Sequence, residues 1–206
     1  MSEVREPTAP EYYDRRAPEY DDWSLGAGLF EGRDRPGFAA EVEAVGAALR
    51  TLAPAVTLDV ACGTGFLTRH LSGTITGLDQ SERMLEIARE QVPDATFARG
   101  DGLALPFADG AFERVVSGHF YGHLDEWQRA RFLAETRRVA GELVIVDASI
   151  AHSEVGEQWA QRTLEDGSEW TVFKRWFTPE GLLGELGGGE ILMAGEWFLV
   201  VRAPRS

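Results

Sequence analysis

The chain has 206 residues, enough for one domain with a substantial core and too few for two domains of ordinary size. Its 44% hydrophobic and 26% charged residues are typical of a globular protein. The formal net charge of −14 argues against a nucleic-acid-binding surface, which needs a basic stripe. We therefore expect a single domain over residues 1–206 that does not bind nucleic acid.

The cysteine content and the chain start predict the cellular compartment. The one cysteine, Cys62, cannot form a disulfide within the chain, which fits a reducing cytoplasm. Residues 1–7 lack the apolar stretch of a signal peptide, and no apolar run approaches the roughly 20 residues of a membrane span. We expect a cytoplasmic protein without membrane contact, with residues 1–8 frayed.

Residues 11–37 precede the first regular pattern and contain the aromatic residues Tyr12, Tyr13, Tyr20 and Trp23. So many aromatic side chains are unusual in a solvated arm, and Pro18 interrupts any helix here. Two interpretations are open. The segment can form a lid that excludes water from a site, or its aromatic residues can simply pack on the sheet edge. Hydrophobic spacing then predicts an amphipathic helix over residues 38–52.

The next stretch predicts a strand, a tight turn and a helix. Alternating apolar residues predict a buried strand ending at Val60, with Val56 and Leu58 inside. Small residues at 61, 63 and 65 allow a sharp turn against a ligand. We expect a helix to follow, with four residues in its first turns: Phe66, Leu67, His70 and Leu71. Such a helix would direct free N–H groups at a nucleotide.

A second strand over residues 76–79 ends in Asp79, whose carboxylate suits the two hydroxyls of a ribose. A dinucleotide fingerprint would need its third glycine at position 66 or 68, where the chain has Phe66 and Thr68. A P-loop is excluded because no Gly-Lys-Ser/Thr sequence follows the turn. The spacing therefore points to a nucleoside ligand of another kind.

The remaining chain continues the alternation of strands and helices. We expect a helix capped by Ser81, a strand at 95–99, a ligand-facing loop at 101–110 and a strand at 112–118. A helix capped by Asp125 should run to about residue 139 with Trp127 on its buried side, before a central strand at 143–146. Residues 149–178 break the alternation. A helix from Thr178 and a terminal hairpin complete the chain.

Four ordered motifs resemble those of class I S-adenosylmethionine-dependent methyltransferases of the small-molecule type, in particular the ubiquinone- and menaquinone-biosynthesis-like group. They are Asp59-x-Ala61-x-Gly63-x-Gly65, residues 77–85, residues 100–107 and residues 112–117. The resemblance covers roughly residues 11–148. It implies a Rossmann-like, doubly wound α/β sheet of seven strands, mostly parallel with an antiparallel strand in the C-terminal hairpin. It also implies a helical N-terminal cap at 11–37 and an insertion over the active site at 149–178.

The resemblance also implies how S-adenosyl-L-methionine is bound. The backbone at Ala61, Gly63 and Gly65 should hold the methionine part, with Asp59 near its ammonium group. Asp79 should bind the ribose, although an acid at a strand end can simply cap a turn. The remaining predicted cofactor-binding residues are Gln80 and Met84 flanking the adenine, Asp101 and Gly102 at its edge, and Tyr13, Tyr20 and Ser117. Asp101 can alternatively form an Asx turn.

Histidines follow the fourth predicted strand, where the family places groups near the transferred methyl. A histidine titrates near neutral pH, so His119, or less favourably His123, could take a proton from the acceptor. Alternatively, neither acts as a base and the reaction proceeds by proximity alone. We expect no metal site, because the acids at 21, 22 and 34 form no recognisable ligand set with any histidine.

The acceptor is expected to contact Tyr121 and the aromatic and cationic residues of the 149–178 segment. Trp159 and Arg162 lie three residues apart, which puts them on one face if this segment is helical. Together with Lys174 and Arg175 they form a cationic and aromatic cluster that suits a flat acceptor with an acidic group. Arg162 is the preferred residue, because an arginine can pair with a carboxylate in a fork, which a lysine cannot copy. The alternative is that these charges face water while the aromatic residues pack on the sheet.

We expect a methyltransferase that acts on a small molecule, with oxygen, nitrogen or carbon as the methylated atom. A binding module that holds the cofactor without transferring its methyl group is the alternative. A short-chain dehydrogenase is excluded, because its Tyr-x-x-x-Lys pair would need a tyrosine at Trp170, four residues before the only lysine, Lys174. Monomer and homodimer are both open.

Overall fold

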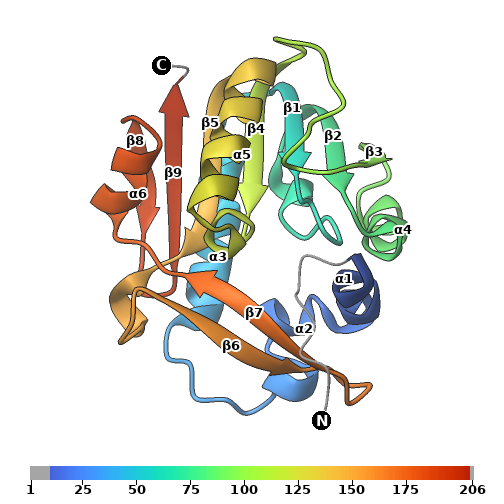
Figure 1. The fold of residues 1–206 in the computed structure, drawn as a ribbon, viewed down its shortest axis with the longest axis vertical. Coiled ribbons are helices and arrows are strands. Elements are labelled where there is room, and N and C mark those ends of the chain that lie inside the picture. Colours follow the sequence, from blue (N-terminus) through green and yellow to red (C-terminus); the bar gives the residue numbers. More distant parts are fainter. Residues whose placement is uncertain (1–9, 205–206) are drawn as a thin grey trace.

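A seven-stranded sheet organises the computed structural model, which describes residues 10–204; the expectation for residues 1–8 lies outside this range (Figure 1). The strand order is β3-β2-β1-β4-β5-β9-β8. The first five strands run parallel, and β9 is antiparallel to both β5 and β8, as predicted. The strands are β1 (Ala55–Val60), β2 (Gly73–Asp79), β3 (Thr96–Arg99), β4 (Phe112–Gly118), β5 (Ala140–Ala148), β8 (Glu190–Ala194) and β9 (Phe198–Pro204).

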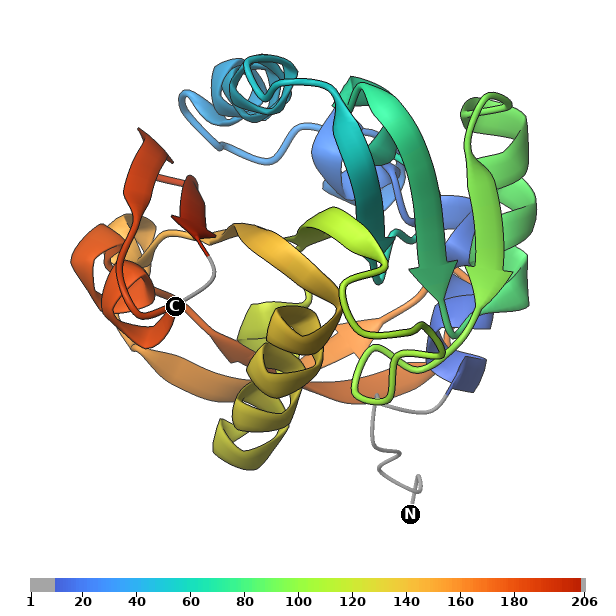
Figure 2. The ribbon, with the colours of Figure 1, turned by 90° about the horizontal axis from the view of Figure 1, so that it is seen from above.

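Helices cover both faces of this sheet, which confirms the doubly wound class (Figure 2). On one face, α3 (Phe38–Arg50) packs on β4, β5 and β9. On the other, α5 (Glu126–Val139) and α6 (Pro179–Glu185) cover the same strands and β1. The fourth helix, α4 (Glu82–Gln91), lies beside β3. Because apolar residues of β4 and β5 alternate between these two clusters, both faces of the central strands are buried.

The predicted helix starts are confirmed by their caps. Ser81 accepts a hydrogen bond from the Met84 N–H, and Thr178 accepts one from the Gly181 N–H. Asp125 and Gln128 form a reciprocal capping box at the start of α5. In the described residues, no helix is long and apolar enough to cross a membrane.

The N-terminal segment lies across the carboxyl ends of the parallel strands (Figure 1). It contains α1 (Pro10–Arg16), η1 (Ala17–Glu19), α2 (Asp22–Leu25) and η2 (Gly28–Phe30). A separate two-stranded hairpin, β6 (Glu157–Thr163) and β7 (Glu169–Arg175), crosses beside it. Three further single-turn helices are η3 (Thr68–His70), η4 (Tyr121–His123) and η5 (Ile150–His152). The N-terminal segment and the β6–β7 hairpin together cover the carboxyl ends of the parallel strands, and we call these two parts the roof.

Three local predictions are wrong. The helix expected after the glycine turn is only the single turn η3, because residues 61–72 must complete that turn and also return to the start of β2. Val56 is 39% exposed, because it lies at the uncovered amino end of β1. Trp127 is 71% exposed. It lies two residues, or about 200° around the helix, from Arg129 on the buried stripe of α5.

Candidate functional site

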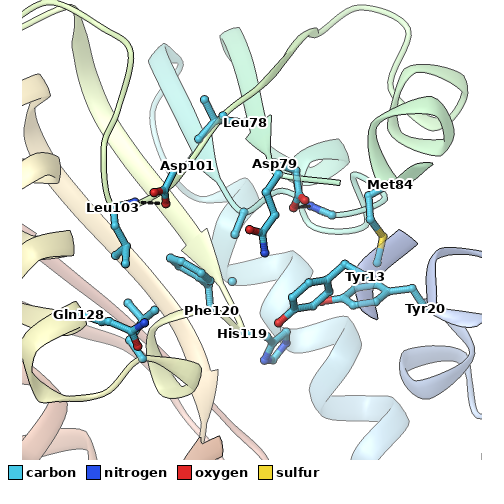
Figure 3. Close-up of a pocket in the computed structure, with 17 residues that line it drawn as sticks. Tyr13, Tyr20, Leu78, Asp79, Met84, Asp101, Leu103, His119, Phe120 and Gln128 are labelled. Carbon is cyan, nitrogen blue, oxygen red and sulfur yellow. Dashed lines mark hydrogen bonds between the residues drawn. The ribbon is translucent and has the colours of Figure 1, made fainter. Parts of the chain in front are cut away.

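A pocket opens at the carboxyl ends of β1, β2 and β4, under the N-terminal segment (Figure 3). Many of the predicted site residues line it: Tyr13, Tyr20, Ala61, Gly63, Asp79, Gln80, Met84, Asp101, Gly102 and His119. The two tyrosines lie on the same side of the pocket as His119, across from Asp101 and Leu103. Residues from five separate stretches of sequence therefore meet at one edge of the sheet, as an open α/β fold requires of a ligand site.

Asp79 fixes the geometry of the pocket floor. One carboxylate oxygen accepts the Gly63 N–H at 2.9 Å, and the other accepts the Ser81 N–H at 2.9 Å. Burial raises the pKa of this carboxyl group, and the backbone hydrogen bonds from Ser81 and Gly63 oppose that shift. Since each oxygen has a further lone pair, the carboxylate can still accept hydrogen bonds from a ligand.

Residues at two places in the pocket wall have a left-handed backbone. Ala61 has φ of 57° and His119 has φ of 55°, and these are the only two residues other than glycine with positive φ in the described chain. Gly63 has φ of 55°, and a Cβ there would approach the Tyr20 ring at 3.5 Å. Backbone strain of this kind concentrates at ligand sites, because the surrounding structure must hold it. Both non-glycine residues with positive φ, Ala61 and His119, line the pocket.

Two carboxylates attach the N-terminal segment to the pocket. Asp14 accepts the Ser81 hydroxyl at 2.5 Å. Asp21 accepts the Thr64 hydroxyl at 2.6 Å and the Gln91 amide at 2.9 Å. These contacts hold the two pocket-lining tyrosines over Asp79, and burial raises the pKa of Tyr20 to about 12. Both phenols therefore stay protonated at neutral pH, since burial also raises the pKa of Tyr13.

His119 is the titratable base that lines the pocket. Its ring packs edge-on against Trp23 and Phe198, with centroid distances of 5.4 Å to each. Burial lowers the pKa of His119 to about 4, and the charges of Lys174 and Arg16 contribute to that decrease while Asp147 opposes it. The imidazole is therefore neutral at physiological pH.

A family model described as "Methyltransferase domain" matches residues 57–162, just over half of the chain. The chain belongs to this family. Among curated proteins, it is 34% identical over 143 residues to a demethylmenaquinone methyltransferase of Renibacterium salmoninarum, covering 66% of this chain and 57% of that protein. It is 40% identical over 102 residues to the Thermotoga maritima protein of the same name, covering 46% and 44%. The chain thus spans about half the length of the curated relatives it matches.

Two solved structures match this chain over almost its whole length. A structure described as "DhpI-SAM-HEP complex" has a TM-score of 0.71 and 25% identity, covering 93% of this chain and 94% of that one. A Thermotoga maritima structure described as a possible histamine N-methyltransferase has a TM-score of 0.68 at 20% identity, covering 94% and 98%. The second likeness supports the fold alone.

Three predicted cofactor residues of this methyltransferase domain lie outside the pocket lining. Asp59 is buried behind the glycine turn, where it accepts the Thr68 hydroxyl at 2.6 Å, and burial raises its pKa to about 7. The Ser117 hydroxyl donates to the Val60 carbonyl at 2.8 Å and so links β4 to β1. Gly65 instead approaches α4, where a Cβ would meet Val92 at 3.1 Å. The structure gives these residues supporting contacts.

Two residues of η4 also point away from the pocket. The His123 Nδ1 lies 2.6 Å from the Phe173 carbonyl, so this nitrogen is the protonated one and donates to β7. Burial lowers the pKa of His123 to about 3, with the Lys174 charge adding to the decrease. The Tyr121 hydroxyl donates to Glu185 at 2.9 Å, and its ring is 1% exposed in the core. Neither residue lines the predicted acceptor site.

The expectation of a shared helical face for Trp159 and Arg162 is wrong, because both belong to strand β6. Residues three apart on a strand point to opposite faces. Trp159 pairs with Phe173 on the outer face and is 61% exposed. Arg162 pairs with Trp170, a buried residue, on the inner face. Neither side chain lines the pocket.

Lys174 is engaged in an ion pair instead of facing an acceptor. Its ammonium group donates to Asp147 at 2.6 Å, and the Asp147 side chain is fully buried. Burial raises the pKa of Asp147, but the charges of Lys174 and His119 and the hydrogen bonds from Lys174 and the Ala148 N–H together outweigh it, so the net shift is downward. Asp147 also accepts the Gly122 N–H at 2.7 Å. The pair therefore attaches β7 to the end of β5 and to η4.

The sequence patterns indicated only part of the far wall of the pocket. Leu103 belongs to the predicted ligand-facing loop at 101–110, whereas no pattern indicated three other residues: Phe120, Leu124 and Gln128. Gln128 belongs to the capping box of α5, a pattern that predicts a helix start and carries no information about a ligand. Phe120 and Leu124 are apolar residues that resemble ordinary core positions in sequence. Among the described residues, no group of three or more His, Cys, Asp or Glu side chains could hold a metal ion.

Proposed function

We propose that the chain transfers a methyl group from S-adenosyl-L-methionine to a small-molecule acceptor. The charge of the pocket is the observation that carries this proposal. Among the described residues, two aspartates line it and no lysine or arginine does. Such a lining suits a cationic nucleoside and disfavours a cofactor with phosphate groups, which would need positive donors. The structures described as SAM and SAH complexes of DhpI, at 25% and 26% identity, support the same cofactor.

The residues that would hold the cofactor fit its parts. Asp79 would accept hydrogen bonds from the ribose hydroxyls, since its oxygens have lone pairs beyond those used by Gly63 and Ser81. Asp101 would face the adenine edge while its other contact, the Leu103 N–H at 2.8 Å, keeps it oriented in an Asx turn. When bound, the cofactor supplies an electrophilic methyl group on a sulfonium. The pocket tyrosines would exclude water from it.

We assign His119 to the acceptor side of the reaction. A neutral imidazole can accept a hydrogen bond from an acceptor hydroxyl or amine and so orient its lone pair. The low pKa of His119, about 4, makes it a weak base. This favours orientation of the acceptor over complete proton removal before transfer. His123, with Nδ1 bonded to β7, would act only by holding the roof in place.

The two parts of the roof complete the proposal. The segment at 11–37 would act as the lid, and the 149–178 insertion, which contains the β6–β7 hairpin, would lie over the acceptor. We place the protein in the cytoplasm as a single domain, in accordance with its one cysteine. The names of the curated relatives make a demethylated menaquinone the first acceptor to test, although those alignments cover only about half of each relative.

Two measurements test the proposal in sequence. Calorimetry should detect binding of S-adenosylmethionine and S-adenosylhomocysteine, with no binding of nicotinamide dinucleotides. An acceptor screen should then detect S-adenosylhomocysteine formation. Binding without turnover by any acceptor would favour the alternative of a silent S-adenosylmethionine-binding module. Absence of binding to either ligand would reject both functions.

A further inference from the structure

The two edges of the β6–β7 hairpin differ in what covers them. The edge formed by β7 contacts η4, where the His123 Nδ1 donates to the Phe173 carbonyl at 2.6 Å. β7 also lies between β6 and the seven-stranded sheet (Figure 1). Within residues 10–204, β6 pairs with no strand except β7. The hairpin therefore has one covered edge and one open edge.

Two hydrogen bonds at the ends of the hairpin fix which backbone groups of β6 point toward β7. The Leu164 N–H donates to the Ser168 carbonyl at 3.0 Å, and the Gly156 carbonyl accepts the Trp176 N–H at 2.8 Å. Because bonded and non-bonded pairs alternate in an antiparallel ladder, the even-numbered residues from 156 to 164 bond to β7. The groups that point away belong to Glu157, Trp159, Gln161 and Thr163. Among the described residues, these N–H and C=O groups have no hydrogen-bond partner.

The side chains of β6 leave this edge accessible. Six of its seven residues are exposed, and the central residue, Ala160, is half-buried. The exposed fraction of Trp159 is 61%, and its ring lies 5.4 Å from that of Phe173 on the outer face of the hairpin. An exposed aromatic residue beside unpaired backbone groups is typical of a strand that can accept another strand.

The two edges of the seven-stranded sheet are protected in ways that β6 is not. At one edge, β3 has only four residues, and α4 lies against it. At the other edge, the register of β8 shifts between Ile191 and Met193. Short edge strands and bulges prevent pairing with other chains. By contrast, β6 has seven residues in unbroken register with β7 and contains no proline.

The charges of β6 favour a second copy of the same strand as its partner. The net charge of −14 makes copies of the chain repel each other in general. β6 itself is neutral, because Glu157 at its amino end balances Arg162 near its carboxyl end. Antiparallel pairing of two copies brings the acidic end of each strand beside the basic end of the other, whereas parallel pairing would bring like charges together.

We propose that two copies of the chain associate through β6, antiparallel and centred on Ala160, into a four-stranded sheet of order β7-β6-β6-β7. This register pairs all four outward-facing residues, with Glu157 opposite Thr163 of the second copy and Trp159 opposite Gln161 of the second copy. Because the same edge is used by both copies, the contact closes on itself and yields a dimer. The inference does not depend on the proposed methyl transfer.

The oligomeric state of the full chain is the first test. A contact made by one strand is small, so we expect a dimer that dissociates on dilution. Sedimentation between about 1 µM and 1 mM covers the range in which weak dimers dissociate. The mass should rise from that of one chain to that of two and then stay constant. A monomer throughout would overturn the proposal, as would continued growth beyond two copies.

Variants at the edge locate the contact. Trp159→Lys places a charge at the edge, and Gln161→Pro removes an outward N–H without removing a bond to β7. Each should weaken the dimer roughly tenfold or more. Trp127→Lys is the matched control, because Trp127 is 71% exposed on α5, and it should change dimerisation by less than about twofold.

Circular dichroism and urea unfolding show whether each variant folds, so that either edge variant can carry the test if the other does not fold. A dimer that keeps its affinity in a folded edge variant would show that another surface is used and would overturn the proposal.

Cross-linking tests the register. In the proposed dimer the two copies of Ala160 form a non-bonded pair with Cα atoms about 4.5 Å apart, within the range that a disulfide spans. Ala160→Cys should therefore form a covalent dimer under mild oxidation. The wild type should not, because its one cysteine, Cys62, is buried. Asp94→Cys, at an exposed position just after α4, is the control and should cross-link at least tenfold more slowly. Equal rates for the two variants would reject pairing through β6.

Discussion

The floor and the roof of the pocket are built in different ways. The floor uses backbone turns at strand ends, where Asp79 bonds to Gly63 and Ser81 within a short stretch of chain. The roof uses side chains from opposite ends of the chain, as in the Arg15–Asp166 pair and the Glu19 contact with the Glu165 N–H. Local backbone contacts form wherever the strand forms, whereas the roof contacts require the whole domain to be assembled. The geometry of the floor is therefore set by local contacts, and that of the roof by contacts between distant parts of the chain.

The largest expected effect comes from the buried pair under the roof. Lys174→Met leaves the Asp147 carboxylate buried without its counter-ion and should lower the free energy of unfolding by about 3–5 kcal/mol. Urea unfolding measures this loss. Arg175→Met, whose ion pairs are partly exposed, is the matched control and should cost no more than about 1 kcal/mol. Equal losses in the two variants would show that the roof does not depend on the buried pair.

The floor is tested by Asp79→Ala. Loss of the carboxylate should weaken S-adenosylmethionine binding by about 1.5–3 kcal/mol, the range for hydrogen bonds to a charged group. Calorimetry compares it with Asp94→Ala, an exposed aspartate near the end of α4. Equal cofactor affinities for Asp79→Ala and the wild type would remove Asp79 from the site and with it the distinction between floor and roof.

The roof should also respond to pH. The folded-state pKa values of His119 and His123, about 4 and 3, lie below the unfolded value of about 6.5. As the pH falls from about 6.5 to 4, these two histidines take up protons in the unfolded chain but not in the folded chain, so their contribution to stability decreases. Asp59, whose folded-state pKa is raised to about 7, contributes with the opposite sign in this window, so the histidine contribution is read from the difference between wild type and variant. The slope should reach about 1.4 kcal/mol per pH unit for each histidine.

Urea unfolding at several pH values measures that slope, and His123→Asn should make it shallower. Asp147, with its lowered pKa, loses its contribution only when the pH falls below its ordinary value of about 3.9, outside this window. A slope that is identical in wild type and variant would contradict the burial assigned to His123.

The smallest effect is expected where the roof meets the floor. Asp21→Ala removes the acceptor for Thr64 and Gln91 and should weaken cofactor binding by about 1 kcal/mol, the net value of a hydrogen bond. Asp34→Ala, an exposed aspartate in the following loop, provides the same charge change as a control. If Asp21→Ala binds the cofactor as well as the control does, the N-terminal segment is not coupled to the pocket.

The distinction between local contacts and contacts across the whole chain also explains which features could be predicted from the sequence. Strands and helix caps such as Ser81 depend on neighbours a few residues away, and their predictions are confirmed. The helix expected after Gly65 failed because the short return to β2 overrides local propensity. The β6–β7 hairpin was predicted only as an insertion. Its spacing of aromatic and charged residues fitted a helical face, so Trp159 and Arg162 were wrongly placed on one side.

The pocket-lining residues divide in the same way. Gly63, Asp79 and Asp101 belong to motifs whose geometry is set by the backbone, and all three line the pocket. Tyr121 was expected at the acceptor, but its position depends on Glu185 in α6, a partner that no spacing within η4 indicates. The position of Tyr121 could therefore not be derived from the sequence pattern around it.

The single-turn helix η3 has a consequence for ligand choice. A regular α-helix at this point would add its aligned peptide dipoles into a partial positive charge at the glycine turn. One turn of 3-10 helix, Thr68–His70, supplies little of that field. The turn instead has the buried Asp79 carboxylate bonded to the Gly63 N–H, while Asp59 behind it, with its pKa raised to about 7, carries only part of a negative charge at neutral pH. The local electrostatic potential at the turn should therefore be negative, so that a ligand gains binding energy by bringing positive charge to it.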